Sequence, residues 1–138
     1  MTNTKNDISL PWHLRSYLDS RGRPIATVWF DEVGSKDKAR VLKILDYLVW
    51  QPRSEWKRPH FDKLHGSVAQ LGEIRVGLID AVQTRLIGFF EAERMVFTIV
   101  VVMTKKERNY LPRDWEQISI RRMNEIKANS RCADEWYP

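Results

Sequence analysis

Three apolar stretches follow one another in the second half of the chain with very short links between them. They cover residues 72–79, 83–90 and 95–103, and the links are residues 80–82 and 91–94. Links of three or four residues join antiparallel neighbours, because a parallel pair needs a crossover of a dozen residues or more. The sequence therefore predicts a three-stranded antiparallel meander. Its third strand should be central in the sheet, because it is apolar on both faces.

Helices are predicted on both sides of this meander. Before it, apolar residues recur at helical spacing from an N-cap at Ser35 to just before Pro52, which disfavours helix in the residue that precedes it. After it, Asp114 begins a second helix that should run to about residue 128. Gln117, three residues further on, completes a capping-box pattern with Asp114.

The remaining segments carry weaker signals. Residues 12–18 are predicted as a first strand, and residues 25–30 fit both a strand and one face of a helix. Residues 52–71 contain two prolines and a glycine and are interpreted as a long loop. Residues 1–10 are interpreted as a flexible leader, and residues 129–138 as a tail.

In chain order, the predicted elements are a strand, two helices, the antiparallel meander and a C-terminal helix. This is an α+β architecture with the helices packed on one sheet. A chain of 138 residues has the length of one domain, so a single domain is predicted at residues 11–138.

The composition is typical of a globular protein. Hydrophobic residues make up 43% of the chain and charged residues 30%, and no apolar run approaches the ~20 residues that span a bilayer. The polar N-terminus lacks the apolar core of a signal peptide, and the single Cys132 excludes an internal disulfide and a cysteine-based zinc site. A cytoplasmic location without a membrane partner is therefore predicted. The net charge of +5 is compatible with a polyanionic partner.

The two faces of the first meander strand differ in character. Because side chains alternate along a strand, Glu73 and Arg75 share one face. Ile74, Val76 and Leu78 share the other face and are expected in the core.

The polar face predicts a surface for phosphate. Arg75 would lie beside Arg85 of the next strand, with Lys105 and Lys106 at the rim, and guanidinium groups bind phosphate well. Alanine at Arg75, Arg85 or Lys106 is expected to leave the fold intact, because none of them is expected in the core. The alternative interpretation is that these are solvated cross-strand residues.

An ordered set of motifs resembles one known family, the RelE/ParE toxin superfamily, and within it the HigB-like branch with phage-derived members. The motifs are Leu64-His65-Gly66, Leu71-Gly72-Glu73-Ile74-Arg75-Val76, Arg85-Leu86-Ile87, Lys105-Lys106 and Tyr110-Leu111-Pro112. The resemblance covers about residues 12–128 and is strongest over 64–112.

The resemblance implies a RelE-like fold and a type II toxin that cleaves mRNA on the ribosome without a cofactor or metal. It also implies a helix-turn-helix antitoxin as partner, beside the ribosome and mRNA. Arg75, Arg85 and Lys106 match basic catalytic positions of RelE, Lys105 is a neighbour of one of them, and Tyr110 lies close to a catalytic tyrosine. Glu73 stands where RelE has a lysine, so the acid and base roles do not carry over.

The predicted loop supplies further candidates. His65 is a candidate for proton transfer, because histidine titrates near neutral pH. The predicted RNA contacts are Arg53, Lys57, Arg58 and Lys63, with Trp56 as a stacking residue. A metal site at His60 and His65 is not expected, because their spacing is not that of a ligand pair.

Two alternatives to the nuclease remain open. One is a ParE-like protein that inhibits DNA gyrase without catalysis. The other is an inactive phage accessory protein with the same fold, which Glu73 at a usually basic position favours.

Overall fold

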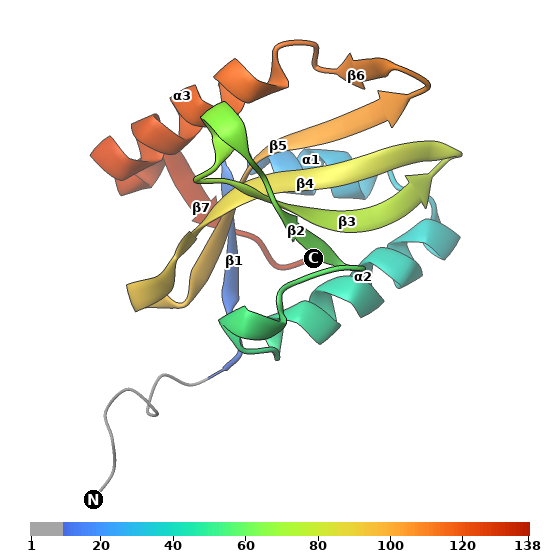
Figure 1. The fold of residues 1–138 in the computed structure, drawn as a ribbon, viewed down its shortest axis with the longest axis horizontal. Helices are drawn as coiled ribbons and strands as arrows, with labels where there is room; N and C mark the ends of the chain where they lie inside the picture. Colours follow the sequence, from blue (N-terminus) through green and yellow to red (C-terminus); the bar gives the residue numbers. More distant parts are fainter. Residues whose placement is uncertain (1–9) are drawn as a thin grey trace, which may run out of the picture.

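The computed structural model describes residues 10–138, which form a sheet with helices on both faces (Figure 1). The predicted leader lies outside the described residues, except for Leu10. The helices are α1 (Ile25–Asp31), α2 (Ser35–Val49) and α3 (Trp115–Ala128). The strands are β1 (His13–Tyr17), β2 (Phe61–Lys63), β3 (Gly72–Ile79), β4 (Val82–Glu91), β5 (Val96–Lys106), β6 (Asn109–Leu111) and β7 (Ala133–Glu135). Short 3-10 turns are η2 (Arg53–Glu55), η3 (Gly66–Val68), η4 (Ala92–Arg94) and η5 (Ser130–Cys132).

The sheet has seven strands in the order β2-β3-β4-β5-β1-β7, and β6 pairs with the end of β5. β1 runs parallel to β5, and the other pairs are antiparallel. The predicted RelE-like arrangement of strand, two helices, three-stranded meander and helix is therefore wrong, because the molecule is dominated by a seven-stranded mixed sheet. The meander itself is present as β3-β4-β5, and β5 is central, between β4 and β1.

Three short strands account for this error. β2, β6 and β7 have three residues each, which is fewer than the four to eight residues needed to recognise alternation in a sequence. β2 lies in the segment interpreted as a loop, and β7 lies in the predicted tail. Each becomes a strand through its partner: Asp62 pairs with Glu73, and Ala133 pairs with Tyr17 far earlier in the chain.

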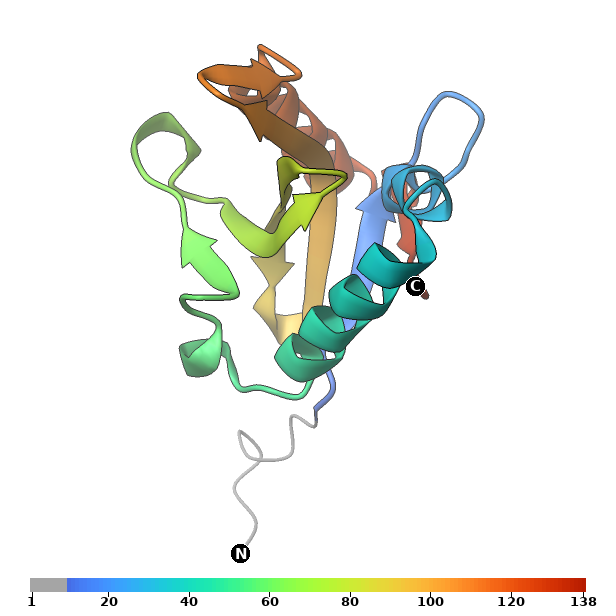
Figure 2. The ribbon, with the colours of Figure 1, turned by 90° about the vertical axis from the view of Figure 1, so that its right-hand side faces the viewer.

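Apolar side chains on the two faces of the sheet build two cores. α1 and α2 cover one face, through residues such as Phe30, Val41 and Leu45, and Figure 2 shows both helices on the right-hand side of the sheet. α3 covers part of the other face, through Met123 and Ile126. None of the helices within residues 10–138 is long and apolar enough to cross a membrane.

The predicted helices are confirmed within one or two residues, but their caps differ. Residues 25–30, which fitted either element, lie in the helix α1. Gly34 is the N-cap of α2, so Ser35 is its first residue rather than its cap. Asp114 is the N-cap of α3 as predicted, but its side chain makes no capping hydrogen bond, so the predicted capping box with Gln117 is not formed.

A bulge in β3 changes which residues enter the core. Gly77 has a φ of +80°, and the pairing with β4 shifts between Arg75 and Gly77. An extra residue in one strand moves the following side chains to the other face. Ile79 is therefore buried and Leu78 is 54% exposed, so the expectation that Leu78 belongs to the core is wrong.

The β3–β4 hairpin allows a test of backbone strain. Asp80 and Ala81 form its two-residue turn with φ values of 52° and 65°, as in a type I′ turn, which favours glycine at the second position. Ala81→Gly should raise the free energy of unfolding by about 1 kcal/mol, measured by urea denaturation, because glycine adopts this conformation without steric cost. Ala39→Gly, at an exposed position inside α2, is the matched control and should lower stability by about the same amount. A loss of stability in both variants would contradict the turn assignment.

Candidate functional site

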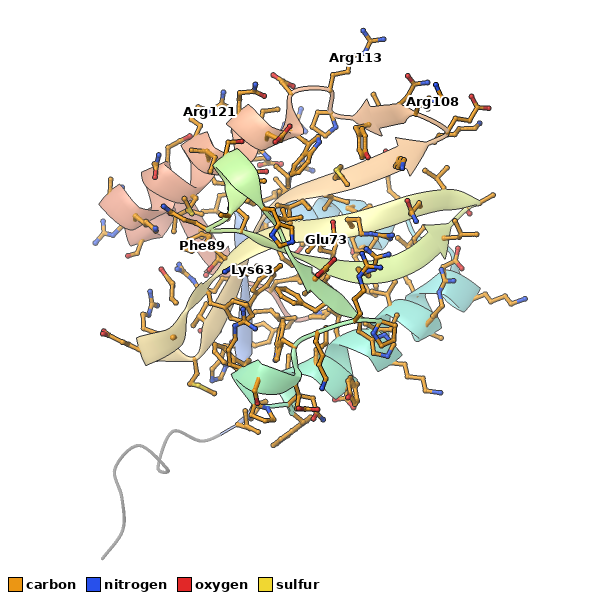
Figure 3. All side chains as sticks on the ribbon, viewed as in Figure 1. Lys63, Glu73, Phe89, Arg108, Arg113 and Arg121 are labelled. Carbon is orange, nitrogen blue, oxygen red and sulfur yellow. The ribbon has the colours of Figure 1, made fainter. Side chains whose placement is uncertain are left out.

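β3 and β4 bring Glu73, Arg75 and Arg85 together on the sheet face that also carries α3. Arg75 is the direct partner of Arg85 in the strand register, so both side chains leave the same face. This confirms the predicted neighbourhood of the two arginines. Glu73 precedes Arg75 by two residues and shares the face, and Figure 3 shows Glu73 on the side of the sheet that faces the viewer.

One carboxylate lies between the two guanidinium groups. Glu73 Oε2 accepts a hydrogen bond from Arg75 Nη1 at 2.6 Å and lies 3.5 Å from Arg85 Nε. The exposed fractions of the side chains are 12% for Glu73, 24% for Arg75 and 7% for Arg85. Arg75 is therefore the cation of this group that a phosphate can reach most directly.

Arg85 is the buried member of the group. Its Nη1 donates a hydrogen bond to the backbone oxygen of Thr84 at 3.1 Å. Burial lowers the pKa of Arg85, the charge of Arg75 lowers it further, and Glu73 opposes both effects. Because a buried charge is costly without a partner, Arg85 needs Glu73 as its counter-ion. The premise that Arg85 lies outside the core is therefore wrong, because its side chain is buried, and we now expect alanine at this position to lower stability.

β2 adds a second ion pair next to the first. Asp62 lies opposite Glu73 in the register of β2 and β3, and Asp62 Oδ2 lies 2.9 Å from Arg58 Nη2. The charge of Arg58 also contributes to the lowered pKa of Arg85, which places Arg58 near the group. Arg58 was among the predicted RNA contacts. Asp62 was not assigned to the site, because its segment was interpreted as a loop, although the buried Phe61 followed by Asp62 is a short alternating pattern.

Lys105 and Tyr110 lie on the same face of the sheet as Glu73, Arg75 and Arg85, in the hairpin formed by β5 and β6. Arg85 pairs with Met103, and Lys105 follows Met103 by two residues. Lys105 pairs with Tyr110 of β6, and its Nζ lies 5.3 Å from the centroid of the tyrosine ring. Lys106, the next residue, belongs to the opposite face, where it lines a cavity together with Trp29. The structure therefore does not bring Lys106 together with Arg75 and Arg85.

Two of the predicted loop contacts are part of an aromatic cluster. Trp56 is only 3% exposed, and its ring centroid lies 5.9 Å from that of Trp12 and 5.0 Å from that of Phe90. The predicted stacking of RNA on Trp56 is therefore wrong, because its ring is already covered by other aromatic rings. The guanidinium carbon of Arg53 lies 4.1 Å from the Phe90 centroid, and burial lowers the pKa of Arg53.

The other loop candidates are at the surface. Lys57 is exposed and lies 3.6 Å from Glu55. Lys63, at the end of β2, and His65, just before η3, are both exposed. Within residues 10–138, no hydrogen bond or ion pair joins His65 to Glu73, Arg75 or Arg85. His60 packs against Tyr47 of α2 with ring centroids 5.4 Å apart.

The chemistry available here is that of a carboxylate with adjacent cations. Among residues 10–138, no group of three or more His, Cys, Asp or Glu side chains is arranged to hold a metal ion. A carboxylate such as Glu73 can accept a proton from a hydroxyl group. Arg75 can bind a phosphate through two parallel hydrogen bonds, and Arg85 holds Glu73 in place from behind.

Comparisons with known proteins provide no family assignment. No protein-family model matches the chain, and no curated protein matches it.

Proposed function

We propose that this protein is a metal-independent endoribonuclease that cleaves mRNA on the ribosome. It would be the toxin of a type II toxin–antitoxin pair, or a phage-derived homologue, acting in the cytoplasm. The observation that carries the proposal is the position of the Glu73 carboxylate, in contact with Arg75 and 3.5 Å from Arg85 on one sheet face. The ordered motifs over residues 64–112 support the same class of protein.

In this proposal a phosphodiester of the RNA binds at Arg75. Glu73 accepts the proton of the adjacent ribose 2′-OH, and the 2′-oxygen then attacks the phosphorus. The bond to the 5′-oxygen breaks, which leaves a 2′,3′-cyclic phosphate and a 5′-hydroxyl end. Arg75 stabilises the additional negative charge of the transition state. Lys105 and Tyr110, on the same face, are the groups that can return a proton to the leaving oxygen.

Expression of the free protein in bacteria is expected to arrest growth and to produce mRNA cuts in a fixed codon phase. The measurement is growth after induction, combined with mapping of mRNA 5′ ends. Normal growth with intact mRNA at high soluble expression would exclude the nuclease. DNA breaks trapped on gyrase would instead support the ParE-like alternative, and inactivity in both assays would support an inactive accessory protein.

A second assay, with purified protein, separates ribosome-dependent cleavage from general ribonuclease activity. The purified protein should cut mRNA in a translating extract and leave naked RNA intact. A site with so few groups depends on the ribosome to orient the 2′-OH for in-line attack, and orientation contributes several kcal/mol to catalysis. Equal cutting of naked RNA by protein free of contaminating nuclease would contradict the ribosome dependence.

A further inference from the structure

A second arginine beside Arg75 is also held by a carboxylate. Arg58 precedes β2, and its Nε and Nη2 atoms lie 3.0 Å and 2.9 Å from Asp62 Oδ2. Asp62 is directly opposite Glu73 in the register of β2 and β3, so the two carboxylates leave the same face of the sheet. Glu73 in turn holds Arg75. Two guanidinium groups are therefore fixed by separate carboxylates on adjacent strands, which are about 4.8 Å apart.

Both guanidinium groups have donors left for an anion. Within residues 10–138, Nη1 of Arg58 makes no hydrogen bond or ion pair, and the same is true of Nε and Nη2 of Arg75. The Arg58 side chain is 66% exposed. It lies beside β2, which is an edge strand and which Figure 2 shows at the left-hand margin of the molecule. An extended ligand can therefore reach Arg58 and Arg75 together.

The charges around the two arginines sum to a positive value. Residues 53–63 contain four bases and two acids, and the group on β3 and β4 adds two arginines and one glutamate, so the net charge is 6 − 3 = +3. All three acids form ion pairs with bases of the same region, which are Glu55–Lys57, Asp62–Arg58 and Glu73–Arg75. The nearest helix, α2, contributes Lys43 and Asp46 beside Tyr47, and these two charges cancel. An anionic partner is therefore favoured.

The arginines also repel one another. Burial is the main cause of the lowered pKa of Arg85, and the charges of Arg75 and Arg58 lower it further. Three guanidinium groups are thus gathered on one face against two carboxylates. An anion bound between them would relieve this repulsion, because like charges at short range raise the free energy.

We propose that Arg58 and Arg75 bind two successive phosphates of the RNA strand, and that Asp62 is the positioning residue that orients Arg58. This inference rests on the proposed function, in which the phosphate that is cleaved lies at Arg75. The neighbouring phosphate would lie at Arg58. Two fixed guanidinium groups hold the strand in one register, so less freedom remains to be lost when the 2′-OH aligns for attack.

The test uses the full chain and ligands that cannot be cleaved, so its result is independent of the nuclease assays. The probes are the dinucleotide of 2′-deoxyuridine, which has one phosphodiester, and the same dinucleotide with a further phosphate at its 5′ or 3′ end. Dissociation constants are measured by NMR titration at low salt. One of the two end phosphates should tighten binding about tenfold, as expected for one additional charge-assisted hydrogen bond. Absence of a gain from either end phosphate would overturn the proposal.

Arg58→Gln tests the second phosphate directly. The gain from the end phosphate should fall to about twofold or less, while the affinity for the plain dinucleotide stays within about twofold of the parent. Arg23→Gln is the matched control, because Arg23 is held by Asp19 in the same way, through Nε at 3.1 Å and Nη2 at 3.0 Å, just before α1. It should keep the full gain. A full gain in Arg58→Gln would overturn the proposal.

Asp62→Ala separates positioning from charge. Loss of a negative charge alone would tighten phosphate binding and increase the gain. If Asp62 orients Arg58, the gain should instead fall to about threefold or less. A gain of tenfold or more in a variant that melts as a folded protein would overturn the positioning role. Inorganic pyrophosphate that binds as tightly as the best dinucleotide, with the same loss in Arg58→Gln, would assign the two arginines to a small diphosphate and overturn the assignment to RNA.

Discussion

Arg75→Ala is expected to abolish growth arrest and to reduce mRNA cleavage by about 10²–10³-fold, which is the usual cost of losing one group that stabilises the transition state. Arg75 is the most exposed cation of the group around Glu73, and its removal leaves Arg85 as the counter-ion of that carboxylate. Arg75→Lys should not restore activity, because lysine cannot form two parallel hydrogen bonds with a phosphate. The measurements are growth after induction and single-turnover cleavage in a translating extract.

The matched control for this variant is Arg94→Ala. Arg94 is an exposed arginine that is also paired with a glutamate, Glu91 at 3.2 Å, and it lies in the η4 turn at the opposite end of β4. Its loss should leave cleavage unchanged and alter stability by no more than about 1 kcal/mol. Thermal melting of each variant is needed, because an unfolded variant is inactive for trivial reasons. A folded Arg75→Ala protein with full toxicity would show that Arg75 is a solvated cross-strand residue and that the proposed site is wrong.

Gly88→Ala is expected to lower the free energy of unfolding by about 3 kcal/mol, because overpacking of a core forces the backbone to move. A Cβ atom at Gly88 would collide with the backbone oxygen of Thr98 and would lie 2.7 Å from Cε2 of Phe97. Gly88 also marks the register shift between β4 and β5. Neither neighbour can move freely, because one is backbone of the central strand and the other is a fully buried ring.

Urea denaturation measures this effect, with Gly34→Ala as the control. Gly34 precedes α2, and a Cβ atom there would meet no other atom within 4 Å. Its replacement should change stability by about 1 kcal/mol or less. Equal small effects at both glycines would mean that β4 and β5 are not as close at the bulge as the structure shows.

The predictions that held were those with a long or repeated signal. The meander and the helices α2 and α3 extend over eight or more residues each, so the period of their apolar positions identifies them. The neighbourhood of Arg75 and Arg85 followed from the short hairpin between their strands, which leaves few possible registers.

The predictions that failed depended on contacts between distant segments. Trp56 is surrounded by charged residues in the sequence, but it is buried because Trp12 and Phe90 approach it in the folded chain. Leu78 is exposed because one extra residue at Gly77 reverses the faces of β3 beyond that point. Lys106 lies outside the site because side chains alternate along β5, so Lys106 is on the face opposite to Lys105.

The sequence by itself determined the helices α2 and α3, the meander and the pair of arginines, because local periodicity and short links require only neighbours in the chain. The pairing of the other four strands of the sheet, β1, β2, β6 and β7, was decided only by the tertiary structure. β1 pairs in parallel with β5, and β2, β6 and β7 are too short to be strands without the partners that the fold supplies. The same pairings placed Asp62 opposite Glu73, where Asp62 also forms an ion pair with Arg58. These features arise from hydrogen bonds and packing between segments far apart in sequence, which no local pattern of residues encodes.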